Sequence, residues 1–248
     1  MTTILVHGNP ETDAIWGPLT EALGRDDVVC LSPPGFGAEL PEDFAATHLA
    51  YRDWLVAELE RLDEPAHLVG HDCGGFHVVS VAMHRPDLVR SWVSDVVGVF
   101  DEDYVWHDRA RMWRTPGLGE ELVAAMSGST VEERAAGLRA VGMSTDIATA
   151  IAEHQGPAMG RAVLALYRSL GPEALAEARR DLGKAAARPG LTILATEDTY
   201  VGSEISRRRA AQRAGARVEV LDGLGHWWMV QDPKRGAEVL ARFWRSVG

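Results

Sequence analysis

Short apolar runs alternate with amphipathic stretches along most of the chain. Runs typical of buried strands occupy Ile4–Val6, Val28–Leu31, His67–Gly70, Trp92–Val97, Leu191–Ala195 and Arg217–Leu221. Between them, apolar residues at helical spacing predict helices over residues 16–24, 44–62, 75–84 and 203–213, and from Pro233 onward. Because strands that alternate with helices usually pair in parallel, the pattern predicts an α/β fold with a mostly parallel central sheet covered by helices on both faces.

Residues 101–188 depart from this alternation. They are rich in Ala, Arg and Glu, contain several helical patterns and lack β-branched runs. We therefore expect residues 1–100 and 189–248 to form one α/β core, and residues 101–188 to form an inserted all-helical cap. A chain of 248 residues is long enough for such a unit and short for two independent enzymes.

Composition narrows the class of protein and its partners. The net charge of -11 argues against binding to the phosphates of nucleic acid, which requires clustered Lys and Arg. No signal-peptide pattern and no membrane-length apolar segment occur, so we expect a cytoplasmic protein without a membrane partner. Cys30 and Cys73 indicate no disulfide framework, and His residues at metal-ligand spacing are lacking, so no metal is expected. The sequence leaves open whether the chain forms a homodimer.

The segment Gly70-His71-Asp72-Cys73-Gly74-Gly75 links a predicted strand to a predicted helix. A nucleophile on such a sharp turn needs small residues two positions before and after it, and Asp72 alone fits that spacing. Cys73 would place His71 two positions before the nucleophile, where its bulk does not fit. The alternative interpretation is a glycine-rich turn in which Asp72 merely caps the following helix.

Two distant segments favour the catalytic interpretation. His7-Gly8-Asn9-Pro10 follows the first strand, where the backbone N–H of Asn9 could join that of Cys73 in an oxyanion hole. Gly223-Leu224-Gly225-His226 follows the last strand and supplies a base in the chain order nucleophile, acid, base. His226 is therefore the expected base.

The acid that orients His226 is expected at the end of a strand. The strand Leu191–Ala195 leads into Thr196-Glu197-Asp198, and a short anionic side chain just past a strand end can reach an imidazole in the next loop. Asp198 is the predicted acid. Glu197 and Asp95 are the alternatives.

Taken together, these segments resemble the epoxide hydrolase and haloalkane dehalogenase branch of the α/β-hydrolase superfamily. The motifs HGNPE, PPGFG, GHDCGG and GLGHWW occur in the order of that branch, over nearly the whole chain. Most esterases and lipases carry Ser at the position of the nucleophile on this sharp turn, so Asp72 is the discriminating residue. The resemblance implies an α/β-hydrolase fold, an Asp-His-Asp triad and a cap over the site.

The departures from each subgroup matter as much as the likeness. Haloalkane dehalogenases are similar at HGNP, whose Asn helps to hold the halide, but they carry Trp where this chain has Cys73. Fluoroacetate dehalogenases carry arginines at Cys73 and Phe76. In epoxide hydrolases, cap tyrosines protonate the ring oxygen, and Tyr167 matches one of them, whereas Met112 stands where the second is expected. Tyr167 would then act alone or with a neighbour: His107, Tyr104 or Trp113. It could equally be a plain core aromatic residue.

The function predicted is therefore hydrolysis through an Asp72 ester, which opens a small apolar epoxide to a vicinal diol. A carboxylate is already anionic at neutral pH and can attack an alkyl carbon without a base to prepare it. No metal or organic cofactor is required. The residues expected to line the substrate pocket are Phe36, Trp106, His107, Met112 and Trp113. The alternatives are a haloalkane dehalogenase, an ester or lactone hydrolase, and a binding or non-hydrolytic biosynthetic member of the fold.

Overall fold

A six-stranded parallel sheet forms the centre of the molecule. The computed structural model describes residues 1–248, and the strands run in the order β2-β1-β3-β4-β5-β6. All five strand pairs are parallel, which confirms the predicted fold class. The strands are β1 Thr3–Val6, β2 Val28–Leu31, β3 Ala66–Gly70, β4 Val89–Ser94, β5 Gly190–Ala195 and β6 Ala216–Leu221.

Helices cover both faces of the sheet because alternate strand residues point to opposite sides. In β1, Ile4 and Val6 enter one apolar cluster, and Leu5 enters the other. The first cluster contains side chains of α2 (His48–Leu59), α3 (Cys73–His84) and α10 (Glu204–Arg213). The second contains side chains of α1 (Gly17–Leu23) and α12 (Pro233–Val247). The sheet is therefore buried on both faces, as a parallel sheet requires.

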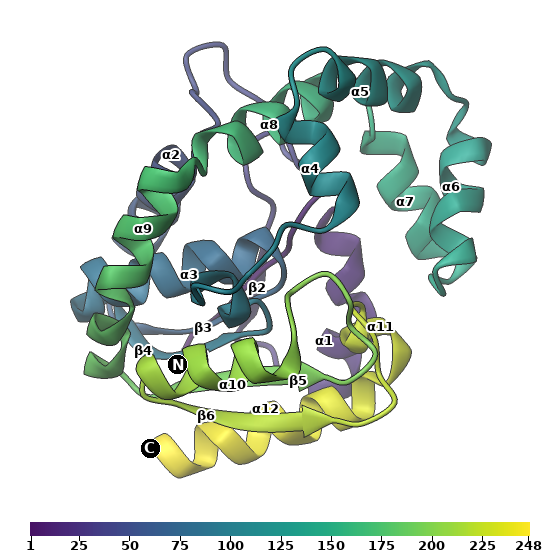
Figure 1. The fold of residues 1–248 in the computed structure, drawn as a ribbon. Helices are drawn as coiled ribbons and strands as arrows, with labels where there is room; N and C mark the ends of the chain where they lie inside the picture. Colours follow the sequence, from purple (N-terminus) through teal and green to yellow (C-terminus); the bar gives the residue numbers. More distant parts are fainter.

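Six α-helices lie between β4 and β5, where the sequence predicts an all-helical insertion. They are α4 Asp108–Arg114, α5 Leu118–Gly128, α6 Val131–Ala140, α7 Thr145–His154, α8 Pro157–Ser169 and α9 Pro172–Asp181. Helices α4 to α8 lie above the sheet in the view of Figure 1, where α6 and α7 form a separate pair. Leu175 of α9 and Leu182 belong to the apolar cluster on the α3 face, so the end of this segment packs on the core.

Element boundaries differ from the predicted ones mainly at chain turns. The helix expected over residues 44–62 begins at His48, where the Thr47 hydroxyl accepts a hydrogen bond from the Ala50 N–H. Side-chain capping of this kind fixes a helix start more sharply than apolar spacing does. A short helix that the sequence did not predict, α11 (Trp228–Gln231), follows His226.

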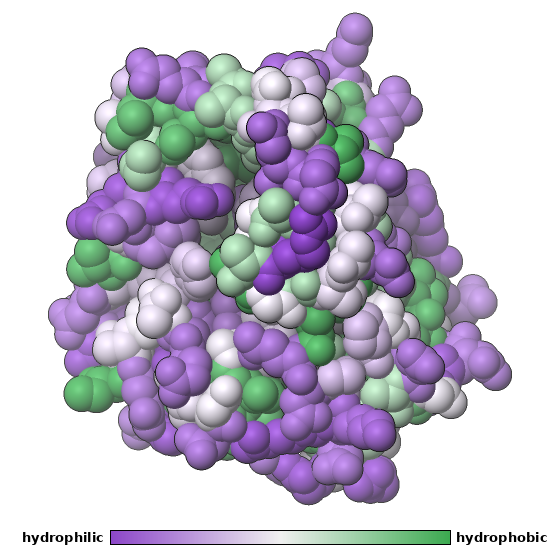
Figure 2. Space-filling model, turned by 90° about the vertical axis from the view of Figure 1, so that its right-hand side faces the viewer, coloured by the Kyte–Doolittle hydropathy of each residue, from purple (hydrophilic) through white to green (hydrophobic).

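The face drawn in Figure 2 mixes hydrophilic residues with several apolar patches. None of the helices combines the length and the apolarity that crossing a bilayer would demand. Both cysteines are free.

Candidate active site

Asp72 lies on the sharp turn between β3 and α3. Its backbone has φ 47° and ψ −127°, a strained combination for a residue with a side chain, and its carboxylate makes no capping hydrogen bond to α3. A Cβ at Gly70 would lie 2.5 Å from the Gly74 carbonyl oxygen, and one at Gly74 would lie 2.2 Å from the Val6 carbonyl oxygen. Both glycines are therefore sterically required, and the turn presents Asp72 for a purpose other than capping.

The loop after β1 approaches this carboxylate. The Asn9 N–H donates a hydrogen bond to Asp72 Oδ2 at 3.2 Å. Gly8 permits the approach, because a Cβ there would lie 2.4 Å from the Asp72 Cβ. Cys73 is the first residue of α3, so its N–H has no acceptor within the helix. The two N–H groups expected to form an oxyanion hole thus flank Asp72.

His226 and Asp198 form a buried pair at the carboxyl ends of β5 and β6. The Nδ1 atom of His226 lies 2.9 Å from Asp198 Oδ2. Burial alone would lower the pKa of His226, but the Asp198 carboxylate more than offsets this and raises it. The Tyr200 N–H also donates to Asp198 Oδ1 at 2.8 Å, which fixes the carboxylate. Glu197, an alternative acid, has an exposed side chain.

Asp95, the other alternative acid, serves a different imidazole. Its Oδ2 lies 2.6 Å from His71 Nδ1 and accepts a hydrogen bond from the Trp228 indole at 2.8 Å. Its Oδ1 accepts from the Asp72 N–H at 3.0 Å, which helps to hold the strained turn. Asp95 therefore stabilises the turn through hydrogen bonds to His71 and to the backbone of Asp72.

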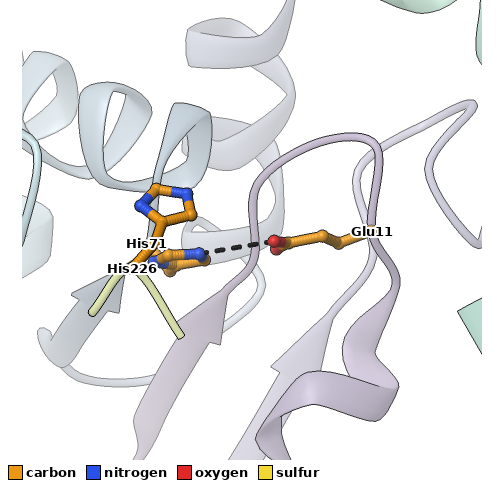
Figure 3. A group of neighbouring side chains, drawn as sticks. All are labelled: Glu11, His71 and His226. Carbon is orange, nitrogen blue, oxygen red and sulfur yellow. Dashed lines mark ion pairs between the residues drawn. The ribbon is translucent and has the colours of Figure 1, made fainter. Parts of the chain in front are cut away.

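Glu11, which the sequence reasoning did not single out, completes this second network. Its Oε1 lies 3.4 Å from His71 Nε2 and accepts a hydrogen bond from the Trp227 indole. Burial alone would lower the pKa of His71, but Asp95 and then Glu11 raise it well above its usual value. Burial would raise the pKa of Glu11, yet the charge of His71 lowers it to about 2. Figure 3 shows the Glu11 carboxylate directed at the His71 ring, with His226 beside it.

Glu11, His71 and His226 are also the residues best placed to hold a metal ion. One ligand atom from each lies within 4.8 Å of the others. The raised pKa of His71 means that its ring carries a proton between two carboxylates, and a metal would have to displace that proton. The cluster is consequently better suited to an ion pair than to a metal.

A cavity of about 450 Å³ extends from Asp72 and His226 to the helices between β4 and β5. This volume suits a small organic ligand. Four of the predicted cap residues line it: His107, Met112, Trp113 and Tyr167. Trp106 instead lines a smaller space of about 20 Å³, which also reaches Asp72.

Phe36 does not line either space. Its ring packs 5.7 Å from that of Tyr51 inside an apolar cluster, and its side chain is buried. Gly35 and Gly37, both with positive φ, turn the loop so that Phe36 enters this cluster. Phe36 is therefore a packed core residue that borders neither of the two spaces next to Asp72.

Tyr167 lies on α8 and lines both spaces together with Asp72. Its ring contacts those of Trp106 and Trp113, at centroid separations of 5.6 and 5.0 Å. Burial raises its pKa well above the usual value, so the hydroxyl keeps its proton. Tyr167 is thus a protonated phenol that borders the same cavity as the Asp72 carboxylate.

With this geometry in view, comparison with known proteins assigns the chain to a family. The model of a family described as "Alpha/beta hydrolase family" matches residues 3–239. The chain belongs to the alpha/beta hydrolase family. A Pseudomonas savastanoi pv. phaseolicola protein, named provisionally as the carbamate hydrolase RutD, is 33% identical over 95 residues. That match covers 36% of this chain and 36% of the relative.

Solved structures share this fold over nearly the whole chain. Haloalkane dehalogenase DbeA from Bradyrhizobium elkani USDA94 has a TM-score of 0.71 and 20% identity, over 99% of this chain and 91% of that one. E-2-(acetamidomethylene)succinate hydrolase has a TM-score of 0.70 and 22% identity, over 98% and 90%. At such identities the likeness shows an alpha/beta hydrolase fold and does not separate the two chemistries.

Among the cavity-lining residues of this alpha/beta hydrolase that the sequence did not predict, two are aromatic. Tyr200 lies between His107 and His226, with ring centroids 5.1 and 4.9 Å from theirs. Trp227 lies beside His226, 5.1 Å away. Each is adjacent or nearly adjacent to a predicted triad residue, and that proximity was the available signal.

Proposed function

We propose that this alpha/beta hydrolase opens an epoxide through a covalent ester on Asp72. The observation that carries the proposal is one cavity bordered by the Asp72 carboxylate, the His226 imidazole and the Tyr167 phenol. A carboxylate suits attack on an alkyl carbon, which a hydroxyl nucleophile attacks poorly. The protonated phenol suits a ring oxygen that must gain a proton as its bond to carbon breaks.

In the first step, an Asp72 oxygen bonds to a ring carbon and the carbon–oxygen bond of the epoxide breaks. Tyr167 gives its proton to the departing oxygen, which becomes a hydroxyl group. In the second step, His226 takes a proton from a water molecule, and the hydroxide attacks the ester carbonyl carbon of Asp72. The N–H groups of Asn9 and Cys73 stabilise the resulting oxyanion, a contact worth about 3 kcal/mol per donor. The bond between the Asp72 carbonyl carbon and the ester oxygen then breaks, and His226 gives its proton to the departing diol oxygen. The carboxyl proton left on Asp72 returns to Tyr167 through solvent, which restores all three groups.

Haloalkane dehalogenation is a second candidate that one observation favours. The Asn9 side chain lines the cavity, is 6% exposed, and has no hydrogen-bond partner at either Oδ1 or Nδ2. An unpartnered buried amide is costly, and its N–H₂ group could hold a halide as it departs. The position after the nucleophile, Cys73, supplies no second side-chain donor of comparable strength.

Replacing His226 with Gln tests both candidates. Because His226 acts only in the second step, the variant should accumulate the Asp72 ester. With styrene oxide, intact mass spectrometry should show an increase equal to the whole epoxide. With a bromoalkane it should show the alkyl group alone, together with released bromide.

Peptide mapping should place the added mass on Asp72, and the double variant Asp72→Ala, His226→Gln should show none. An adduct with epoxides alone supports the first candidate, and one with bromoalkanes alone supports the second. No adduct with either panel would overturn the Asp72 ester mechanism and favour an ester hydrolase or a non-hydrolytic role.

A further inference from the structure

Arg207 is a buried cation without a carboxylate partner. The residue is 4% exposed, and no Asp or Glu oxygen lies within ion-pair distance of its guanidinium group. Its Nη1 donates a hydrogen bond to the Ala195 carbonyl oxygen at 2.8 Å, and its Nε has no partner. Arginine is rarely buried unless it is paired, so this placement calls for an explanation.

Other arginines of the same helix are satisfied at the surface. Arg208 pairs with Glu204, and Arg209 pairs with Asp101 and Asp103. Glu204, the one carboxylate of this helix, is therefore already engaged by Arg208. The helix turns Arg207 inward, toward the end of β5.

That inward position is the base of the loop that carries Asp198. Ala195 ends β5, and its carbonyl oxygen also accepts a hydrogen bond from the Asp198 N–H at 3.3 Å. The side chain of Arg207 thus donates to the same oxygen that holds the backbone of the acid. Arg207 and Asp198 also line one open groove on the outer side of the loop.

Arg207 also packs between two loops. A Cβ at Gly98 would lie 2.8 Å from the Arg207 Cγ and 2.3 Å from the Val201 carbonyl oxygen. Gly98 follows Asp95 after β4, and Val201 follows Asp198 after β5. The arginine stem therefore fills the space between the two loops that carry the buried acids.

We infer that Arg207 is a positioning residue that keeps the Asp198 loop in register with His226. The inference rests on the proposed function only in treating His226 as the base. The hydrogen bond from Arg207 to the Ala195 carbonyl oxygen anchors the start of the loop. The aliphatic part of the Arg207 side chain keeps the loop from collapsing toward Gly98. Removing it should loosen the pairing between Asp198 and His226.

Several charged groups surround Arg207 and His226, and they influence the pKa that a titration of His226 would measure. The charges that act on Arg207 come from Asp198, Glu204, Asp95 and Arg208, in that order of size. The groups that act on His226 or on which it acts are Asp198, His71, Asp72, Glu11 and His107. Because Asp198 raises the pKa of His226 more than any other group, a looser pairing should lower that pKa.

The test uses the full chain without substrate, so it does not depend on knowing the reaction. We would compare wild type, Arg207→Met, Arg207→Lys and the matched control Arg208→Met by NMR of the histidine rings. In wild type, the His226 Nδ1 proton should be shifted downfield by its bond to Asp198. In Arg207→Met this signal should weaken or vanish, and the pKa of His226 should fall by roughly half a unit or more.

The His71 Nδ1 proton, bound to Asp95, provides an internal reference for an intact fold. Arg207→Lys keeps a donor for Ala195 and should restore part of the His226 signal, and Arg208→Met should resemble wild type. An unchanged His226 signal and pKa in Arg207→Met would overturn the inference. A raised pKa would do so too, since it would mean that only the charge had mattered.

If Arg207→Met does not fold, Arg207→Lys decides the question. Its amine is a weaker match for the Ala195 carbonyl than the guanidinium group, so the His226 signal and pKa should lie measurably below those of wild type. Values identical to wild type in Arg207→Lys would then overturn the inference.

On a substrate identified by the trapping experiment, Arg207→Met should reduce the rate of ester hydrolysis about tenfold. The rate of ester formation should stay near wild type, because Asp72 belongs to another loop. If neither variant nor wild type forms an ester, the proposed function fails while the NMR result still decides the role of Arg207.

Discussion

Two imidazole–carboxylate pairs lie side by side beneath the cavity, and they differ in what surrounds the second ring nitrogen. His226 with Asp198 and His71 with Asp95 each join Nδ1 to a carboxylate, at 2.9 and 2.6 Å, and the two rings are 4.4 Å apart. His226 borders the cavity, whereas His71 is fully buried and faces Glu11. The same pairing therefore occurs once facing the cavity and once enclosed by protein.

The two histidines differ in their access to the cavity and not in their pairing with a carboxylate. We expect this access to decide which of them can act as a base and which one only stabilises the structure. His71 lies between two carboxylates that keep it protonated, so it cannot accept a proton from water at neutral pH. His226 has one carboxylate partner and an open side toward Asp72. A general base needs an unprotonated nitrogen within reach of its water, and of the two rings only that of His226 borders the cavity.

The largest expected effect comes from Asp198→Asn, which would break the pair of His226 and Asp198 that faces the cavity. Loss of the carboxylate should leave His226 without its orienting partner and reduce ester hydrolysis by roughly 10³- to 10⁴-fold. Ester formation on Asp72 should continue, so single-turnover kinetics should show a burst followed by a slow phase. Glu197→Gln, which changes the exposed neighbour, is the control and should behave as wild type.

Asp95→Asn, which changes the buried pair of His71 and Asp95, should reduce stability more than activity. Asp95 holds His71, Trp228 and the backbone of Asp72, so its loss leaves a buried cation with a weaker partner. We expect a decrease of about 3 kcal/mol in the free energy of unfolding, measured by urea denaturation, and a smaller loss of activity than in Asp198→Asn. The control Asp53→Asn alters an exposed carboxylate. A larger loss of ester hydrolysis in Asp95→Asn than in Asp198→Asn would assign the acid role to Asp95.

The sequence was sufficient for the elements that local rules govern. Glycines two positions on either side of Asp72 predicted the turn, because that geometry excludes side chains wherever it occurs. Strand and helix order predicted the sheet for the same reason, since the apolar spacing of each element reports its own burial.

Contacts between distant loops could not be read in this way. Spacing left Asp198 and Asp95 as rival acids, because both follow strand ends on the same edge of the sheet. The His71 and Glu11 pair joins two loops that follow different strands, and no local pattern reports which carboxylate faces which ring. The packing of Phe36 against Tyr51 could not be read from the sequence either, because the direction of its loop is visible only in three dimensions.

The smallest expected effect separates the two pairs by pH. Glu11→Gln removes one of the two carboxylates from His71 and should lower the free energy of unfolding by about 2 kcal/mol near pH 6. The pKa of Glu11 falls from 4.5 to about 2 on folding, so its contribution is present above pH 4.5 and is lost as the pH falls toward 2. The pKa of His71 rises on folding, so its contribution is fully present below pH 6.5 and is lost only as the pH rises through the folded value.

The stability difference between wild type and Glu11→Gln should consequently be greatest between pH 4.5 and 6.5 and shrink on the acid side. Urea denaturation at several pH values measures this, with Glu121→Gln, an exposed carboxylate, as the control that should show no such profile. A difference that grows below pH 4.5 would contradict an ionised Glu11. In that case His71 would not be held as a cation, and the enclosed pair would lose the feature that keeps it from competing with His226 for the role of base.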